Sequence, residues 1–298
     1  MTTQNYTRTD LACEARPTAL PKETGIRANE WEEDGINISD LHILDRKAAE
    51  DCGLSCGRYI TLSRPRLWSL SEDVYTSFRN QLAAQLKMLA REMTGRSPDA
   101  QFGVLVAGLG NRDIPPDAIG PLTVDKLEVT RHLQSHSPQA FRAIGRCMLS
   151  ALAPGVLGQT GIETVELIRG AVENARPDLV IAVDALVARS CERLASTVQL
   201  SDRGIAPGSG IGNNRKSICA DTVGAPVLAL GVPTVVDSST LVYDALARAG
   251  IGEISDELRE VLENGRGFFV SPKESDVIAA QISSLLAEAI EIAFTIAA

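Results

Sequence analysis

The chain has 298 residues, of which 44% are hydrophobic and 22% charged, a composition typical of a soluble globular α/β enzyme and not of a disordered chain. Its net charge of −9 and pI near 5.0 argue against direct binding of nucleic acid through a general basic surface. The six cysteines lack zinc-site spacing or a secreted framework, and neither a signal peptide nor a membrane-length apolar run is found, so we expect a cytoplasmic protein with reduced thiols.

The first seventy residues combine a polar arm with a small β region. Residues 1–20 are polar, irregular and interrupted by prolines, which is typical of an extension. The alternating pattern INISDLHILD after Gly35 predicts a strand, and 58–63 predicts a second one. Ser71, followed by two acidic residues and by leucines at helical spacing, predicts a long helix that ends at Gly95.

The rest of the chain alternates between strand and helix patterns. Short apolar runs predict strands at 102–109, 178–184, 196–200 and 226–232, and amphipathic patterns predict helices at 122–133, 163–175, 238–249 and 273–296. This alternation predicts an α/β fold with a doubly wound, mostly parallel sheet flanked by helices. We expect one α/β domain over residues 11–298, in which 11–70 includes the small additional β region.

The segment 108–121, GLGNRDIPPDAIGP, is the strongest candidate for a site. A buried strand ends there, and Pro115 and Pro116 stiffen the loop and prevent an immediate helix, so that Asp117 is presented before a helix that begins near Pro121. The run 178–184 also ends in a carboxylate, Asp184. Ligands of open α/β sheets bind beyond the carboxyl ends of the strands, so we expect the two aspartates to share one crevice.

Two carboxylates at one crevice can act as a catalytic pair. Their mutual repulsion raises one pKa, which leaves a protonated group to polarise a carbonyl and an ionised group to activate water. Spacing alone also fits the commoner roles of aspartate as a helix cap or turn former.

Other motifs leave further alternatives open. GLGNRD fails as a dinucleotide fingerprint because Asp113 replaces the third glycine, and the signatures of P-loop, zinc-peptidase and serine-hydrolase sites are absent from the sequence. His132 and His136 have the spacing of a metal pair, although a solvated or locally bonded pair is commoner. The glycine-rich stretch 207–216 fits a connecting loop or a loop that closes over an extended substrate. Arg189 fits a solvated surface position or a carboxylate-binding role.

Together these motifs carry a family resemblance. GLGNRDIPPDAIGPL, VTRHL, LAPGVLGQTGIET, PDLVIAVDALVARS and LGVPTVVD, in this order, resemble the germination proteases of spore-forming bacteria over nearly the full length. The resemblance implies an endopeptidase that initiates degradation of the small acid-soluble DNA-binding spore proteins. It also implies a zymogen, cytoplasmic in the forespore and spore core and typically tetrameric. This family is classed among atypical aspartic proteases.

The same resemblance assigns the site residues. The family segments T-P-D-A-L-G-P and I-D-A-L match PPDAIGP and VDAL, which places the catalytic aspartates on Asp117 and Asp184. We expect Gly110 and Asn111 to shape the crevice through backbone amides, and Arg189 or Arg193 to meet the acidic residue before the scissile bond.

A second likeness supplies the main alternative function. The fold is expected to be similar to that of hydrogenase-maturation endopeptidases, which share a G-x-G-N strand end and a later D-A, and whose acidic residues hold a metal. We expect no metal or other cofactor here. A metal-dependent maturation-type peptidase is the first alternative, and a catalytically inactive scaffold is the second.

The resemblance also gives the N-terminal arm a function. Members of the family cut after an acidic residue and before a large apolar residue followed by alanine, and Asp10-Leu11-Ala12 fits this pattern. We therefore expect self-cleavage between Asp10 and Leu11, which makes residues 1–10 a propeptide. The chain departs from familiar members by a shorter segment at 250–267.

Overall fold

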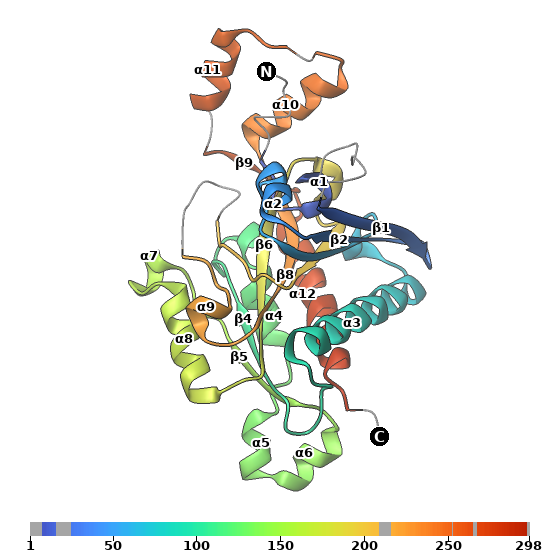
Figure 1. Cartoon of the computed structure of the whole chain (residues 1–298), viewed down its shortest axis with the longest axis vertical. Helices are drawn as coiled ribbons and strands as arrows, with labels where there is room; N and C mark the ends of the chain where they lie inside the picture. The colour runs from blue at the N-terminus through green and yellow to red at the C-terminus, as the bar shows by residue number, and fades with distance from the viewer. Residues whose placement is uncertain (1–7, 16–24, 209–215, 252, 265–266, 297–298) are drawn as a thin grey trace.

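The computed structural model describes residues 8–15, 25–208, 216–251, 253–264 and 267–296. Within these ranges the chain forms one nine-stranded sheet in the order β1-β2-β3-β7-β8-β6-β4-β5, with β9 paired to β8 (Figure 1). The strands are β1 Ile26–Glu33, β2 Ile36–Ile43, β3 Gly57–Ser63, β4 Gly103–Gly108, β5 Met148–Leu152, β6 Leu179–Ala188, β7 Thr197–Ser201, β8 Val227–Asp237 and β9 Phe269–Val270.

Helices lie on both faces of this sheet. The α-helices are α1 Ala12–Ala15, α2 Arg46–Cys52, α3 Glu72–Thr94, α4 Ile119–Lys126, α5 Arg131–His136, α6 Pro138–Ile144, α7 Leu157–Thr160, α8 Thr164–Ala175, α9 Ala220–Val223, α10 Ser238–Arg248, α11 Asp256–Asn264 and α12 Ser275–Ala293. Short 3₁₀ turns are η2 Leu67–Ser69, η3 Pro115–Asp117 and η4 Cys191–Arg193. Across the ranges that the structure describes, no helix has both the length and the apolar content needed to span a bilayer.

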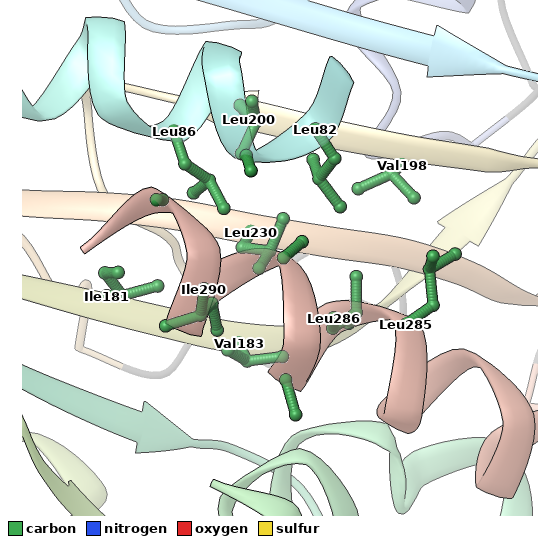
Figure 2. Close-up of a cluster of buried hydrophobic side chains, with 14 of the residues drawn as sticks. Leu82, Leu86, Ile181, Val183, Val198, Leu200, Leu230, Leu285, Leu286 and Ile290 are labelled. Atoms are coloured by element: carbon green, nitrogen blue, oxygen red, sulfur yellow. The ribbon is translucent and has the colours of Figure 1, made fainter. Parts of the chain in front are cut away.

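Alternating side chains of the central strands bury two opposite cores. Val104 of β4 and Val183 of β6 belong to the core under α3 and α12, whereas Leu105 of β4 and Val180 of β6 belong to the core under α8. Figure 2 shows the first of these cores, where Val183 lies among side chains of α12. Because these strands are buried on both faces, each appears in the sequence as a continuous apolar run. The predicted α/β class with flanking helices is confirmed.

The sheet is parallel in one half and antiparallel in the other. β5, β4, β6 and β8 run parallel, whereas β7 is antiparallel to β8 and β3, and β3, β2 and β1 continue as an antiparallel meander. The small β region predicted near the N-terminus therefore extends the same sheet through β7.

One long helix follows its sequence signals and another does not. α3 begins after Ser71 and ends at Thr94, and the next residue, Gly95, has a φ of 68°, the left-handed conformation of a helix C-cap. The single helix predicted over 122–133 is wrong, because α4 ends at Lys126 and α5 begins at Arg131. At this break the Thr130 hydroxyl donates to the Cys147 carbonyl at 2.6 Å and accepts from the Leu149 amide at 2.9 Å. This bonding next to β5 ends the helix.

The fully buried Cys147 gives a prediction about thiol reactivity. Burial raises the pKa of this thiol to about 12. At pH 8 only about one molecule in 10⁴ would carry the reactive thiolate. We expect iodoacetamide to leave Cys147 unlabelled in the folded chain and to label it in urea, as measured by peptide mass mapping. The exposed Cys191 is the internal control. Equal labelling rates of the two thiols in the folded chain would contradict the burial.

Candidate active site

Both predicted aspartates line one large cleft. The cleft has a volume of about 1680 Å³, and its lining includes Asp117, Asp184 and Gly110. It is also lined by Asp10 and Gln199. The structure therefore brings together the two carboxylates and the expected self-cleavage residue.

Asp184 lies where the neighbouring strand ends. We expected the strand to end at Asp184, but β6 continues to Ala188, paired with the long strand β8. β4 ends at Gly108, opposite Val183, so Asp184 lies one residue beyond the end of β4. The carboxylate is therefore at the carboxyl end of β4 and not of β6. Its side chain is largely buried, with the residue 6% exposed, and its Oδ1 accepts from the Ala185 amide at 2.9 Å.

Asp117 closes a short 3₁₀ turn beside the same strands. Pro115 and Pro116 were expected to prevent a helix, yet they occupy the first positions of η3. Proline is tolerated there because the first amides of a helix need no internal partner. α4 follows from Ile119, two residues before the predicted start at Pro121. η3 contacts β6 and β8, and this packing places Asp117 at the cleft.

The loop before η3 wraps around the Asp117 carboxylate. The Asn111 amide donates to Asp117 Oδ2 at 2.7 Å. Gly110 has a φ of 105°, and a Cβ there would lie 2.1 Å from the Asp117 carbonyl oxygen. Only glycine allows this approach, so Gly110 and Asn111 act on Asp117 through their backbone.

A second glycine lets the Asp117 turn approach the Asp184 strand. A Cβ on Gly120 would lie 2.3 Å from the Leu109 carbonyl oxygen and 2.6 Å from that of Val183. The first turn of α4 thus rests directly on the backbone next to Asp184.

Residues 8–15 are docked in the same cleft. The Asp10 amide donates to the Val187 carbonyl at 2.9 Å, and Asp10 Oδ2 accepts from the Val187 amide at 2.9 Å. Leu11 is fully buried in a cluster with Leu186, Ala188, Leu194 and Val236. Ala12 is fully buried in a different cluster, next to β2, β3 and α2. The predicted cleavage site is held on both sides of the Asp10–Leu11 bond.

Gln199 of β7 holds the backbone of this segment, and sequence reasoning missed it. Its Nε2 donates to the Asp10 carbonyl at 2.9 Å, and its Oε1 accepts from the Ala12 amide at 2.7 Å. No local motif marks a glutamine in a strand, because both contacts are made by residues far away in the chain.

The two candidate arginines have other contacts. The Arg189 amide donates to Glu14 Oε2 at 2.7 Å, and its guanidinium donates to the Glu14 carbonyl at 3.2 Å. Arg193 Nη1 donates to Ser63 Oγ at 3.1 Å. Arg189 thus contacts Glu14, a buried residue of the docked segment that follows Asp10 by four positions.

The thiols and histidines supply no clear catalytic group. Burial raises the pKa values of Cys13 and Cys52, the two thiols that line the cleft, which disfavours the nucleophilic thiolate. His132 and His136 lie on α5, where the His136 ring bonds locally to the His132 carbonyl. Among the described residues, no three side chains of His, Cys, Asp or Glu form a group that could hold a metal ion. Of the glycine-rich loop, Pro207 and Gly208 line the cleft, and 209–215 lie outside the described residues.

Comparison with known proteins gives one consistent family. A family model described as germination protease matches residues 8–255. A germination protease of Caldanaerobacter subterraneus subsp. tengcongensis is 38% identical over 96% of this chain and 93% of that protein. One from Clostridium acetobutylicum is 37% identical over 97% of this chain and 95% of that protein. One from Bacillus licheniformis is 43% identical over 82% of this chain and 67% of that protein.

Proposed function

This chain belongs to the germination protease family, and we propose that it is an endopeptidase that initiates degradation of small acid-soluble spore proteins during germination. One observation carries the proposal. Asp117 and Asp184 line the same cleft as Asp10, the acidic residue of a docked acidic–apolar–alanine segment of the chain itself. This segment has the sequence pattern that the family cleaves, and its acidic residue faces the same cleft as the two carboxylates.

The proposed chemistry is of the aspartic type. One carboxylate, ionised, takes a proton from water, and the water oxygen attacks the peptide carbonyl. The other, protonated, delivers a proton to the leaving nitrogen, so that no covalent intermediate forms. Each carboxylate accepts a hydrogen bond from a backbone amide, but Asp184 is buried whereas Asp117 is only partly buried. Different surroundings of this kind are the condition for separate acid and base roles.

The docked segment suggests how the zymogen is kept inactive. Asp10 lines the cleft, and Leu11 and Ala12 fill two buried apolar clusters beside it, so the segment takes up binding positions that a substrate of the same pattern would need. Self-cleavage between Asp10 and Leu11 would free residues 1–10 and begin activation. A tetramer located in the forespore and spore core completes the proposal by analogy with the family.

The experiment that tests this function uses the full-length chain. Purified chain is incubated with a small acid-soluble spore protein and with a peptide that contains Glu-Phe-Ala, and the products are sequenced. We expect cuts after the acidic residue and a new protein N-terminus at Leu11. No cleavage of any substrate would support the inactive scaffold, and cleavage abolished by a chelator and restored by metal would support the metal-dependent alternative. A new N-terminus elsewhere would overturn the assigned self-cleavage site.

Replacing Gly110 by alanine tests the loop that holds Asp117. The added Cβ clashes with the Asp117 carbonyl, so η3 must shift. A shift of about 1 Å at a catalytic group can slow a reaction about 10²-fold, and we expect a loss of that order in the cleavage rate. Gly95→Ala is the control, since Gly95 also has a positive φ but nothing lies within 4 Å of its added Cβ. Similar rates for the two variants would contradict the role of Gly110.

A further inference from the structure

Gln199 contacts the two backbone groups on either side of Leu11. Its carboxamide nitrogen reaches the Asp10 carbonyl oxygen, and its carboxamide oxygen reaches the Ala12 amide. These two contacts hold the side chain at both ends of its carboxamide, and the residue is buried, with 7% of its surface exposed. A carboxamide that donates to residue i and accepts from residue i+2 fixes the register of the peptide whatever its side chains are.

The sheet places Gln199 level with Asp184. Asp184 of β6 pairs with Gly231 of β8, and Gly231 pairs with Gln199 of β7. Residues directly opposite on neighbouring strands project from the same face, so Asp184 and Gln199 flank the glycine, with α-carbons separated by two strand spacings, about 9–10 Å. All three residues line the cleft. A Cβ on Gly231 would lie 2.5 Å from the Leu186 side chain, so the glycine between them makes room for this leucine, which belongs to the same cluster as Leu11.

From this arrangement, and resting on the proposed function, we infer that Gln199 is a catalytic residue that donates to the carbonyl oxygen of the scissile bond. The Asp10 carbonyl is the group that water attacks if the chain is cut between Asp10 and Leu11. As the water oxygen bonds to the carbonyl carbon, the π electron pair moves to the carbonyl oxygen, which becomes negatively charged. Gln199 Nε2 already lies 2.9 Å from that oxygen.

The remaining steps balance without any other reactant. One aspartate accepts the proton that water loses on attack. When the tetrahedral intermediate collapses, the electron pair returns from the oxygen, the bond between the Asp10 carbon and the Leu11 nitrogen breaks, and the other aspartate protonates the nitrogen. Gln199 exchanges no proton in this sequence. It stabilises the negative oxygen, and its Oε1 keeps the Ala12 amide in place.

The test measures self-cleavage in the full-length chain. Intact mass gives the first-order rate at which the fragment beginning at Leu11 appears. Removal of one oxyanion donor typically slows a reaction about 10²–10³-fold, and we expect this loss for Gln199→Ala. Gln199→Glu should be at least as slow, because it retains an acceptor for the Ala12 amide but cannot donate to the Asp10 carbonyl. Gln101→Ala, at an exposed glutamine outside the cleft, is the control and should keep the wild-type rate.

The outcomes separate this inference from the proposed function. A Gln199→Ala chain that keeps its melting temperature and self-cleaves within threefold of wild type overturns the inference alone. Wild-type speed in Gln199→Glu together with a slow Gln199→Ala reduces Gln199 to a backbone clamp and also overturns it. If the wild-type chain is never cut between Asp10 and Leu11, both the self-cleavage proposal and the inference fail.

Discussion

Replacing Asp184 by asparagine is expected to slow cleavage of an acidic–apolar–alanine substrate about 10³-fold or more. Asparagine has the same shape and still accepts from the Ala185 amide, so the buried strand should be unchanged. What is lost is a group that can exchange a proton with water or with the leaving nitrogen, and such groups contribute about 10²–10⁴-fold. Initial rates on a synthetic peptide measure the loss of cleavage of a separate substrate, and the intact mass of the chain over time measures the loss of self-cleavage.

A matched control lies just before the other end of the same strand. Asp178 accepts from the Gly103 amide at 2.8 Å and pairs with Arg96, so its carboxylate is engaged in holding β4 and β6 together. Asp178→Asn should therefore lower the melting temperature slightly and leave the cleavage rate near that of wild type. A fully active, correctly folded Asp184→Asn chain would remove Asp184 from the chemistry.

Replacing Gly120 by alanine is expected to destabilise the chain by about 3 kcal/mol, the upper part of the range for overpacking. The added methyl would meet three backbone atoms, the nitrogen and oxygen of Leu109 and the oxygen of Val183. Backbone atoms cannot turn aside as a flexible side chain can, so α4 must move away from β4 and β6. Urea unfolding followed by far-UV circular dichroism measures the change in free energy.

Gly170 gives the opposite expectation for the same substitution. It also lies within a helix, α8, but nothing is within 4 Å of its added Cβ. Alanine is there the better helix former, and Gly170→Ala should stabilise the chain by about 0.5–1 kcal/mol. If both variants shift the unfolding midpoint in the same direction, the close approach at Gly120 does not determine the effect of alanine on stability.

Local signals in the sequence were sufficient to predict the ends of an element where those ends depend on residues close by in the chain. Ser71 and Gly95 bound α3 as predicted: Gly95 has the left-handed conformation of a C-cap, whereas Ser71 holds the N-cap position without a side-chain cap hydrogen bond. The break after Lys126 could not be predicted, since it depends on bonds from Thr130 to residues 147 and 149. The length of β6 likewise depends on its pairing with β8.

The candidate site divides in the same way. Asp184 could be found because it ends an apolar run, and Asp117 because it lies in the proline-stiffened loop that follows another apolar run. Both segments also match a family pattern. Gln199 could not be found, because the amide that it accepts from lies 187 residues away in the sequence. The contact between Arg189 and Glu14 could not be predicted either; the sequence led us to expect that Arg189 or Arg193 meets the acidic residue before the scissile bond.

The docking of Leu11 and Ala12 in two separate apolar clusters has a further consequence for competition between ligands. A segment joined covalently to its own binding site competes as an intramolecular ligand, whose effective concentration does not fall when the protein is diluted. Under the proposed function, a substrate would therefore compete from solution against a ligand that is always present. The uncut chain would then be inactive toward substrate even if its two aspartates were already correctly placed.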